Sequence, residues 1–430
     1  MGGLAYIETM ADLRNDDSVD PSATGGHGGQ PDAAEARQRV FDEVDRLADR
    51  LVDVSHRIHA DPELAYAEHR AHDLLCDVLE EANLAVTRGA YGLDTAFEAR
   101  AGGGAGPTVA VICEYDALPG IGHACGHNII AAAGLGAGLA AAAVVDELNG
   151  NLVILGTPAE EGGGGKIAMI DAGALEGVDA AMMLHPSSAD VESMYAIAIQ
   201  QLRVTYQGKA SHAAAHPELG RNALDAAVLG YNAVAALRQH IAPDERVHGI
   251  FTEAGEQPNI VPRRAAAHYY VRSGTLARLE ELKPRVLAAL AGGAQSAGCE
   301  LEVAWVDAPY AELLHNPTLG ARYALHAAAL GRTVAGVEDA SLTIGSTDMG
   351  NVSLEVPSIH PTIAVGPPGS SIHTEAFAAS AASPAGDRAV LDGAKALAAV
   401  AVDLWSDPAV LASARADHRS ATGSRTGGPK

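Results

Sequence analysis

Three clusters of polar residues each follow directly on an apolar run of strand length. DALPGIGHACGHN comes after TVAVICEY, TPAEEGGGGK after NLVILG, and HPSS after AAMML. In an open parallel sheet, sites form where the carboxyl ends of the strands meet, so we expect these clusters to converge. They supply side chains with metal-binding chemistry at Cys125, His127, Glu160, Glu161 and His185. Imidazole, thiolate and carboxylate groups together favour zinc or a similar transition metal.

No single cluster identifies a metal site. Cys125 and His127 could be a buried thiol beside a hydrogen-bonded histidine, and His185 could be an ordinary core histidine at a strand end. The Glu160-Glu161 pair could be solvated charge, but it stands between an apolar strand and four glycines. Glycines let backbone approach closely and leave both carboxylates facing a cavity. The occurrence of all three clusters after consecutive strands is what favours a metal site.

The GGGGK segment looks similar to a phosphate-binding loop but does not meet its requirements. The first Gly of a G-x-x-x-x-G-K motif would fall on Glu160, and Ile167 follows the Lys where a hydroxyl is needed. We therefore predict no nucleotide site in this segment.

Hydrophobic periodicity indicates the elements that position the clusters. The apolar strands alternate with helical patterns at 126–146 and 166–175, which indicates a mostly parallel sheet covered on both faces. From about residue 198 the order β-α-β-β-α-β is typical of a small α+β sandwich with an antiparallel sheet. Helix and strand alternation resumes near residue 310 and ends in an Ala-rich helix at 384–404.

This organisation predicts an inserted domain. We expect an α/β catalytic domain made of residues 34–197 and 309–415, with an α+β domain inserted at 198–308. Residues 1–33 are rich in Gly, Asp, Ser and Pro without periodicity, which predicts a disordered leader. Residues 416–430 have a similar character, and we expect a flexible tail.

The charge, hydrophobicity and cysteine content of the chain indicate which partners and which cellular location to expect. The chain has 29 Lys and Arg against 54 Asp and Glu, a formal net charge of −25, which argues against nucleic-acid or anionic-membrane partners. The apolar stretch from Ile129 to Val145 is short for a membrane span, so we predict a buried helix there. The four cysteines lack disulfide-framework spacing and the N-terminus lacks a signal-peptide pattern, so we expect a cytoplasmic protein with reduced thiols.

The chain resembles the dinuclear metallopeptidase family of aminoacylase, carboxypeptidase G and succinyl-diaminopimelate desuccinylase. Within that family it is most similar to the amidohydrolase branch that contains p-aminobenzoyl-glutamate hydrolase and the β-alanyl-lysine dipeptidases. The matching segments occur in the same order as in the family, and they extend from about residue 55 to residue 380. It rests on CEYDALPGIGHACGHN, GTPAEEGGGGK, GKASHAAAHP, NALDAAVLGYN, PNIVP, GSTDMGNVS and HTEAF.

The resemblance implies a zinc-peptidase-like α/β/α catalytic domain and a ferredoxin-like lid that forms a homodimer. It implies one or two divalent metal ions per protomer, zinc first, with manganese or cobalt as alternatives. Most relatives use a His-x-Asp motif where this chain has Glu114-Tyr115-Asp116, and in this branch Cys125 supplies the missing ligand. The implied ligands are Cys125, His127, Glu161, His185 and His373.

The resemblance also implies roles around the metal. Glu160 matches the catalytic carboxylate, and Asp116 the acid behind the metal. His212 matches a histidine that reaches the partner protomer's active site, whereas Asn259 and Arg272 match positions that hold the substrate carboxylate.

We therefore predict metal-dependent hydrolysis of an amide bond in a small amino-acid conjugate or dipeptide. The candidates are an N-acyl amino acid, an aminobenzoyl-glutamate-like compound or a β-alanyl dipeptide. Glu160 would take a proton from metal-activated water and pass it to the departing nitrogen, while His212 would stabilise the oxyanion. An N-deacetylase or desuccinylase of a biosynthetic intermediate stays open as an alternative. So does a non-hydrolytic relative, such as a metal-dependent binding protein or a transferase.

Overall fold

In the computed structural model, which describes residues 32–338 and 345–423, the apolar strands meet in one six-stranded sheet. Its order is β1-β2-β4-β3-β5-β11. β4, β3, β5 and β11 run parallel, and the antiparallel strands β2 and β1 form one edge. This confirms the predicted α/β fold with a mostly parallel sheet. The strands are β1 (Ala85–Arg88), β2 (Phe97–Gly102), β3 (Thr108–Glu114), β4 (Asn151–Thr157), β5 (Ala180–Met182) and β11 (Ser358–Ile359).

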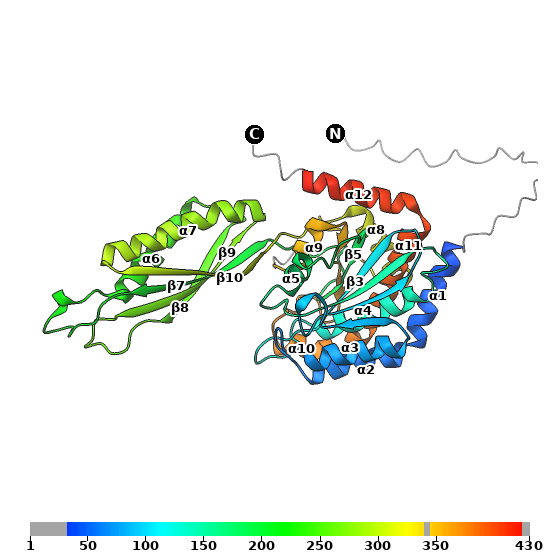
Figure 1. The fold of residues 1–430 in the computed structure, drawn as a ribbon, viewed down its shortest axis with the longest axis horizontal. Helices are drawn as coiled ribbons and strands as arrows, with labels where there is room; N and C mark the ends of the chain where they lie inside the picture. Colours follow the sequence, from blue (N-terminus) through cyan, green and yellow to red (C-terminus); the bar gives the residue numbers. More distant parts are fainter. Residues whose placement is uncertain (1–31, 339–344, 424–430) are drawn as a thin grey trace, which may run out of the picture.

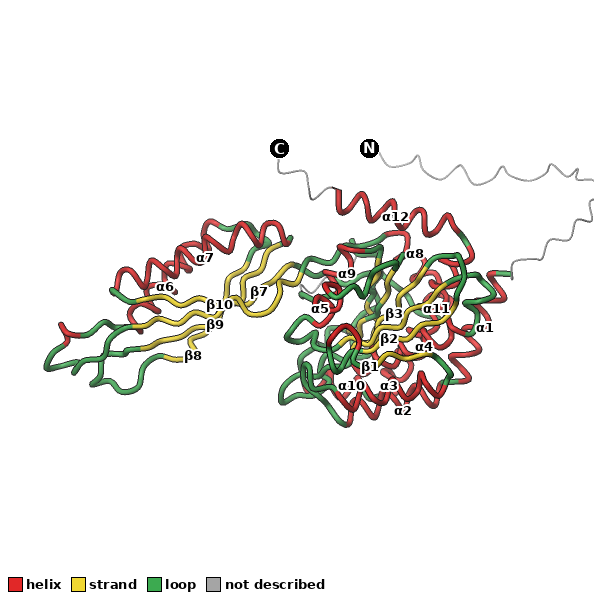
Figure 2. Tube along the Cα trace, in the orientation of Figure 1, coloured by secondary structure: helices red, strands yellow, loops and turns green. Residues whose placement is uncertain are grey.

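Helices cover both faces of this sheet (Figures 1 and 2). Along β3, Val109 and Val111 belong to one buried cluster, whereas Ala110 and Ile112 belong to another on the opposite face. A strand that is buried on both faces has an uninterrupted run of apolar residues in its sequence, and β3 has such a run. The helices are α1 (Ala33–Arg46), α2 (Ala48–Ala60), α3 (His69–Glu81), α4 (His127–Ala142), α5 (Gly165–Asp171), α8 (Pro317–Ala329), α9 (Met349–Glu355), α10 (Glu375–Ala381), α11 (Pro384–Ser406) and α12 (Pro408–Gly423). A short parallel pair, β6 (His185–Ser187) and β12 (Thr362–Ala364), lies beyond β5 and β11.

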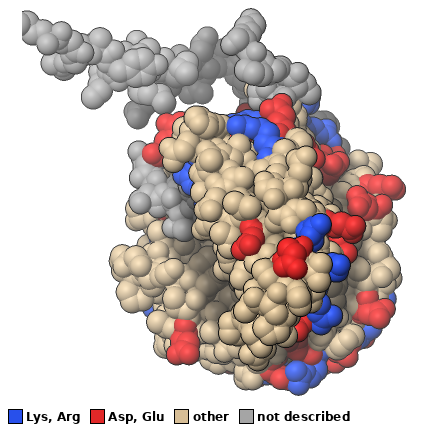
Figure 3. Space-filling model, turned by 90° about the vertical axis from the view of Figure 1, so that its left-hand side faces the viewer, with Lys and Arg blue, Asp and Glu red and all other residues tan. Residues whose placement is uncertain are grey.

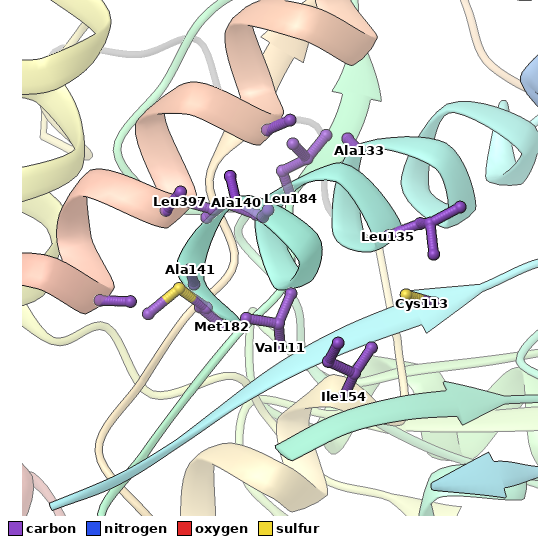
Figure 4. Close-up of a cluster of buried hydrophobic side chains, with 14 of the residues drawn as sticks. Val111, Cys113, Ala133, Leu135, Ala140, Ala141, Ile154, Met182, Leu184 and Leu397 are labelled. Atoms are coloured by element: carbon purple, nitrogen blue, oxygen red, sulfur yellow. The ribbon is translucent and has the colours of Figure 1, made fainter. Parts of the chain in front are cut away.

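Helix α4 is the buried helix expected from the apolar stretch that follows His127. It packs on β3 and against α11, where Figure 4 shows side chains of all three elements in contact. Its glycines allow this close approach. A Cβ on Gly134 would lie 2.6 Å from the Ile112 carbonyl oxygen, and one on Gly138 would lie 2.5 Å from Ile154 Cδ1. Ala and Gly therefore replace bulky side chains so that α4 can lie directly on the sheet.

The chain between Ala198 and Tyr310 forms a second sheet, drawn at the left of Figure 1. Its four antiparallel strands have the order β10-β7-β9-β8, and α6 and α7 pack on it around a separate buried cluster. β7 enters this unit from the larger one and β10 returns to it. The elements are β7 (Ala198–Gln207), α6 (Ala223–Leu237), β8 (Arg246–Glu253), β9 (Arg264–Ser273), α7 (Leu276–Ala297) and β10 (Glu300–Tyr310).

The C-terminal segment differs from the flexible tail that we expected from residue 416. Helix α12 continues through Gly423 because its polar residues bind the larger unit: Asp417 accepts hydrogen bonds from the backbone and hydroxyl of Thr318, and His418 Nε2 lies 3.0 Å from the Ser353 carbonyl oxygen. At the other end, α1 begins at Ala33, and residues 1–31 of the expected leader lie outside the described residues.

Within the described ranges, no single helix has both the length and the apolar character needed to cross a membrane. Helices α11 and α12 meet those criteria only as a pair, which bends by 103°.

Candidate active site

The three polar clusters converge at the carboxyl-terminal edge of the parallel sheet, as expected for this architecture. They border a cavity of about 700 Å³. Its lining includes Cys125, Glu160, Glu161, His185 and His373. The cavity also reaches β7, β9 and β10, so the second unit forms one of its walls.

Two groups of candidate metal ligands share Cys125, and a third group is made of Glu114, His127 and Glu160. The ligand atoms of Cys125, His127 and His185 lie within 4.8 Å of one another, and so do those of Cys125, Glu161 and His373. Cys125 Sγ lies 3.4 Å from His185 Nε2, and His373 Nε2 lies 3.5 Å from Glu161 Oε1. All five residues that the resemblance implied as ligands therefore belong to these two sets, which meet at Cys125.

Three buried polar atoms of these groups have no hydrogen-bond partner among the described residues. They are Glu114 Oε1, His127 Nε2 and Glu161 Oε1. His127 Nε2 lies 3.1 Å from the Glu114 oxygen and 3.9 Å from the Glu161 oxygen. Buried polar groups are normally satisfied, and lone pairs that face one another across this distance fit a bound cation. The donor set therefore fits a divalent metal.

Neighbouring hydrogen bonds orient the candidate ligands. Asp116 lies within 3.1 Å of His127 Nδ1 and accepts the backbone N–H of Glu161 at 2.9 Å. His185 Nδ1 lies 2.7 Å from the Pro186 carbonyl oxygen, to which it donates. In both histidines the Nδ1 contact directs the Nε2 lone pair into the site. A side chain at position 126 would block this packing, because a Cβ on Gly126 would lie 2.5 Å from Pro186 Cγ.

The loop that carries Glu160 has a strained backbone. Ala159 has a φ of 62°, which is unusual for a residue with a Cβ, and its N–H donates to the carboxylate of Glu68 at 2.9 Å. A Cβ on Gly165 would lie 1.9 Å from the Pro158 carbonyl oxygen. Gly165 is therefore needed for the turn that presents both glutamates to the cavity, and so are Gly163 and Gly164, whose φ values are 130° and 69°.

Glu114, Lys166 and Asp348 form a buried charged network behind the glutamates. Lys166 Nζ donates to Asp348 at 2.7 Å and also to Glu114. The sequence analysis did not single out these three residues as a group. Glu114 was recognisable from its position two residues before Asp116, but Lys166 had no local signal because its partners lie far away in the chain.

The surroundings shift the pKa values of the two adjacent glutamates in opposite directions. Burial raises the pKa of Glu160 well above its ordinary value, and repulsion from Glu114 and Glu161 raises it further. Burial also raises the pKa of Glu161, but the nearby imidazoles of His373 and His127 lower it by more. Burial lowers the pKa of His185 to about 4, which keeps its imidazole in the neutral form that binds metals.

The substrate-binding candidates divide into two groups. Arg272 lines the cavity and donates to the Ser346 hydroxyl at 3.1 Å. His212 and Asn259 are not among the residues that line it. They lie together beyond the end of β7, where the N–H of Ala213 donates to the Asn259 carbonyl oxygen at 3.0 Å. β7 begins at the junction of the two units, and a ten-residue strand spans about 30 Å.

Residues 110–403 match the family model of the peptidase family M20/M25/M40. The chain belongs to this family. It is 40% identical over 399 residues to the Xaa-Arg dipeptidase of Mus musculus, which covers 89% of this chain and 92% of that protein. It is 31% identical over 301 residues to one subunit of the p-aminobenzoyl-glutamate hydrolase of Escherichia coli (strain K12), covering 65% of this chain and 62% of that protein.

A solved structure supports the fold assignment. The dinuclear metal-binding M20-family peptidase of Bacillus subtilis superposes with a TM-score of 0.64 at 21% identity, over 83% of this chain and 98% of that one. The comparisons confirm the resemblance to this metallopeptidase family and the prediction of an enzyme that performs metal-dependent hydrolysis of amide or dipeptide bonds.

Proposed function

We propose that this chain hydrolyses dipeptides at a metal centre held by Cys125, His127, Glu161, His185 and His373, with Glu160 as general base. The observation that carries the proposal is the pair of donor sets that share Cys125 at one end of the cavity. Glu160 lies outside these two sets, in a third group with Glu114 and His127, and it lines the same cavity. A divalent cation in such a site acts as a Lewis acid and makes water a nucleophile near neutral pH.

The protein's own groups then move the proton. The raised pKa of Glu160 makes it a stronger proton acceptor than an ordinary carboxylate, and it would take a proton from the attacking water and pass it to the departing nitrogen. Asp116 holds His127 in place, and its hydrogen bond from the Glu161 N–H fixes the backbone next to Glu160. Arg272 offers a planar fork to the substrate carboxylate at the opposite wall of the cavity.

A dipeptide is the substrate class that we favour among the predicted amides. The Xaa-Arg dipeptidase relative matches along nearly its whole length, whereas the aminobenzoyl-glutamate hydrolase relative matches along 62% of its length. We propose zinc as the metal because a thiolate and imidazoles are ligands that zinc prefers. A thiolate ligand also requires reducing conditions, and for this reason we propose a cytoplasmic location.

We propose that the enzyme is a homodimer in which the second unit, residues 198–308, supplies the interface and acts as a lid. β8 is an edge strand, and exposed apolar side chains surround it: Val228, Leu229 and Tyr231 on α6, and Ile250 and Phe251 on β8. Exposed strand edges and apolar patches of this kind are normally covered. Figure 3 looks onto this end of the molecule, where much of the nearest surface is uncharged.

A second copy would explain the position of His212. Its Nδ1 accepts hydrogen bonds from the N–H groups of Ala214 and Ala215 at 3.3 and 3.1 Å. The ring proton must then lie on Nε2, which has no acceptor among the described residues and can donate. We propose that His212 donates this hydrogen bond to the developing oxyanion in the partner's site, and that Asn259 beside it contacts the same substrate.

The experiment that tests the proposed function replaces Glu160 with Gln. The variant should lose about 10²- to 10⁴-fold in kcat towards dipeptides while its metal content, measured by elemental analysis, is retained. Glu176→Gln, an exposed Glu→Gln change on the surface, is the matched control. Undiminished turnover in Glu160→Gln would refute the assignment of the general base.

A further inference from the structure

The cavity contains one acidic side chain that the proposed chemistry does not use. Its described lining includes Glu160 and Glu161 at the metal end, and Arg272 on β9. The remaining carboxylate of the lining belongs to Asp307, on β10. Its side chain is exposed, and the described residues offer its carboxylate neither a hydrogen bond nor an ion pair. An unpaired carboxylate in a binding cavity is suited to a cationic group of a ligand.

A β-bulge holds Asp307 in place. β10 pairs with β7 up to Val306, opposite Gln201, and pairing resumes at Tyr310, opposite Ile199. Asp307 lies in the intervening bulge with a φ of 58°, in the left-handed region that residues with a Cβ rarely adopt. Bulges often redirect a side chain beside a functional site, and strained residues gather at such sites.

Hydrogen bonds fix both ends of this bulge. The side chain of Gln200, which is buried, donates to the Asp307 carbonyl oxygen at 2.8 Å. The hydroxyl of Tyr310 donates to the Glu160 carbonyl oxygen at 2.7 Å. The bulge is therefore tied both to the sheet and to the loop that carries the proposed general base. These two hydrogen bonds limit how far Asp307 can move relative to Glu160.

Asp307 and Arg272 lie on opposite sides of the same strand. Arg272 of β9 pairs with Ile199 of β7. Asp307 lies in the β10 bulge between Val306, opposite Gln201, and Tyr310, opposite Ile199, so their two strands are separated by two strand spacings, or about 10 Å. Their side chains can reach toward each other across the cavity wall. A lysine or arginine residue carries an anion and a cation separated by its side chain, and it matches this pair of opposite charges.

We propose that Asp307 binds the side-chain cation of a basic C-terminal residue whose carboxylate is held by Arg272. Asp307 is then the residue that selects basic dipeptides over neutral and acidic ones. This inference rests on the proposed dipeptide hydrolysis and adds the residue that distinguishes substrates by the charge of their side chain. An acidic C-terminal residue would meet repulsion at Asp307.

The test compares two dipeptides that differ in one charge. Alanyl-arginine and alanyl-citrulline have side chains of nearly the same shape, but citrulline is neutral. The zinc-loaded enzyme should cleave alanyl-arginine with the higher kcat/KM. In Asp307→Asn, kcat/KM for alanyl-arginine should fall roughly ten- to hundredfold, while that for alanyl-citrulline should change by less than about threefold. Asn tolerates a positive φ, so this substitution removes charge without adding strain.

Two further variants keep the test specific. Asp307→Gly removes the carboxylate and relaxes the backbone, and it should show the same loss of preference. Glu300→Gln on the same strand removes a charge outside the cavity and should leave both rates unchanged. Melting temperatures close to that of the wild type verify folding.

Three results would count against the inference, and they are distinguishable. Equal losses on both dipeptides in Asp307→Asn would make Asp307 a general structural residue, and no loss on either would exclude its contact with substrate. In both cases the dipeptidase activity itself would stand. A zinc-loaded wild type that cleaves neither dipeptide would instead overturn the proposed function, and this inference with it.

Discussion

Replacing Glu68 with Gln is expected to stabilise the folded protein at neutral and alkaline pH. Glu68 is fully buried, and its carboxylate accepts hydrogen bonds from the Thr95 hydroxyl at 3.0 Å and from the Ala159 N–H at 2.9 Å. Burial raises its pKa from 4.5 to about 7, with a contribution from the charge of Asp116. Gln preserves the size of the side chain, accepts from Ala159 and can donate to Thr95.

The magnitude follows from proton linkage. A carboxyl group with a raised pKa in the folded state binds its proton more tightly there than in the unfolded chain. Its contribution to stability is therefore present below about pH 4.5 and is lost as the pH rises to about 7. Full ionisation of a group whose pKa has risen from 4.5 to about 7 costs about 3 kcal/mol. Gln has no such cost.

The assay is chemical denaturation of both proteins between about pH 5 and pH 8.5. The free energy of unfolding of Glu68→Gln relative to the wild type should increase by about 2–3 kcal/mol over that range. Glu176→Gln, an exposed change, should show no such trend. A difference that does not depend on pH, or one that decreases as the pH rises, would refute the reasoning that Glu68 is a buried acid with a raised pKa.

Two further predictions concern the metal centre and the dimer. Cys125→Ser should weaken metal binding by at least about 100-fold, because Cys125 belongs to both ligand sets. The control variant Cys299→Ser should bind metal as tightly as the wild type. Competition with a chelator measures both affinities, and equal affinities would exclude a thiolate ligand. His212→Ala and Glu160→Gln should each be nearly inactive alone, but exchange of protomers between them should restore about a quarter of wild-type activity, since half of the dimers would contain one intact composite site. No recovery after verified exchange would argue against a site shared between protomers.

The local pattern of the sequence was sufficient to predict the fold class and the grouping of Cys125, His127, Glu161 and His185. Each of these residues follows an apolar strand, and parallel strands end at one edge of their sheet. His373 follows no strand of this kind, and the family resemblance was needed to include it. The strand and helix periods of the inserted segment likewise matched its four strands and two helices.

Other features depend on segments that are distant in the sequence. Glu114, Lys166 and Asp348 become a buried charged network only when β3, α5 and α9 pack together. The segment after residue 416 resembled a loose tail, but helix α12 forms because Asp417 and His418 find partners on the larger unit. Composition predicts whether a segment can bury its own surface, and it does not show which surface another segment will offer.

What the sequence alone determined about this protein is its chemistry: which side chains stand at strand ends and which reaction they suit. Only the tertiary structure decided which charges share a cavity. It brings Asp307 and Arg272 to one wall and leaves His212 and Asn259 beyond the far end of β7. The physical reason is that periodicity and strand ends are encoded locally, whereas bulges, strand order and the packing of one unit on another set distances through space.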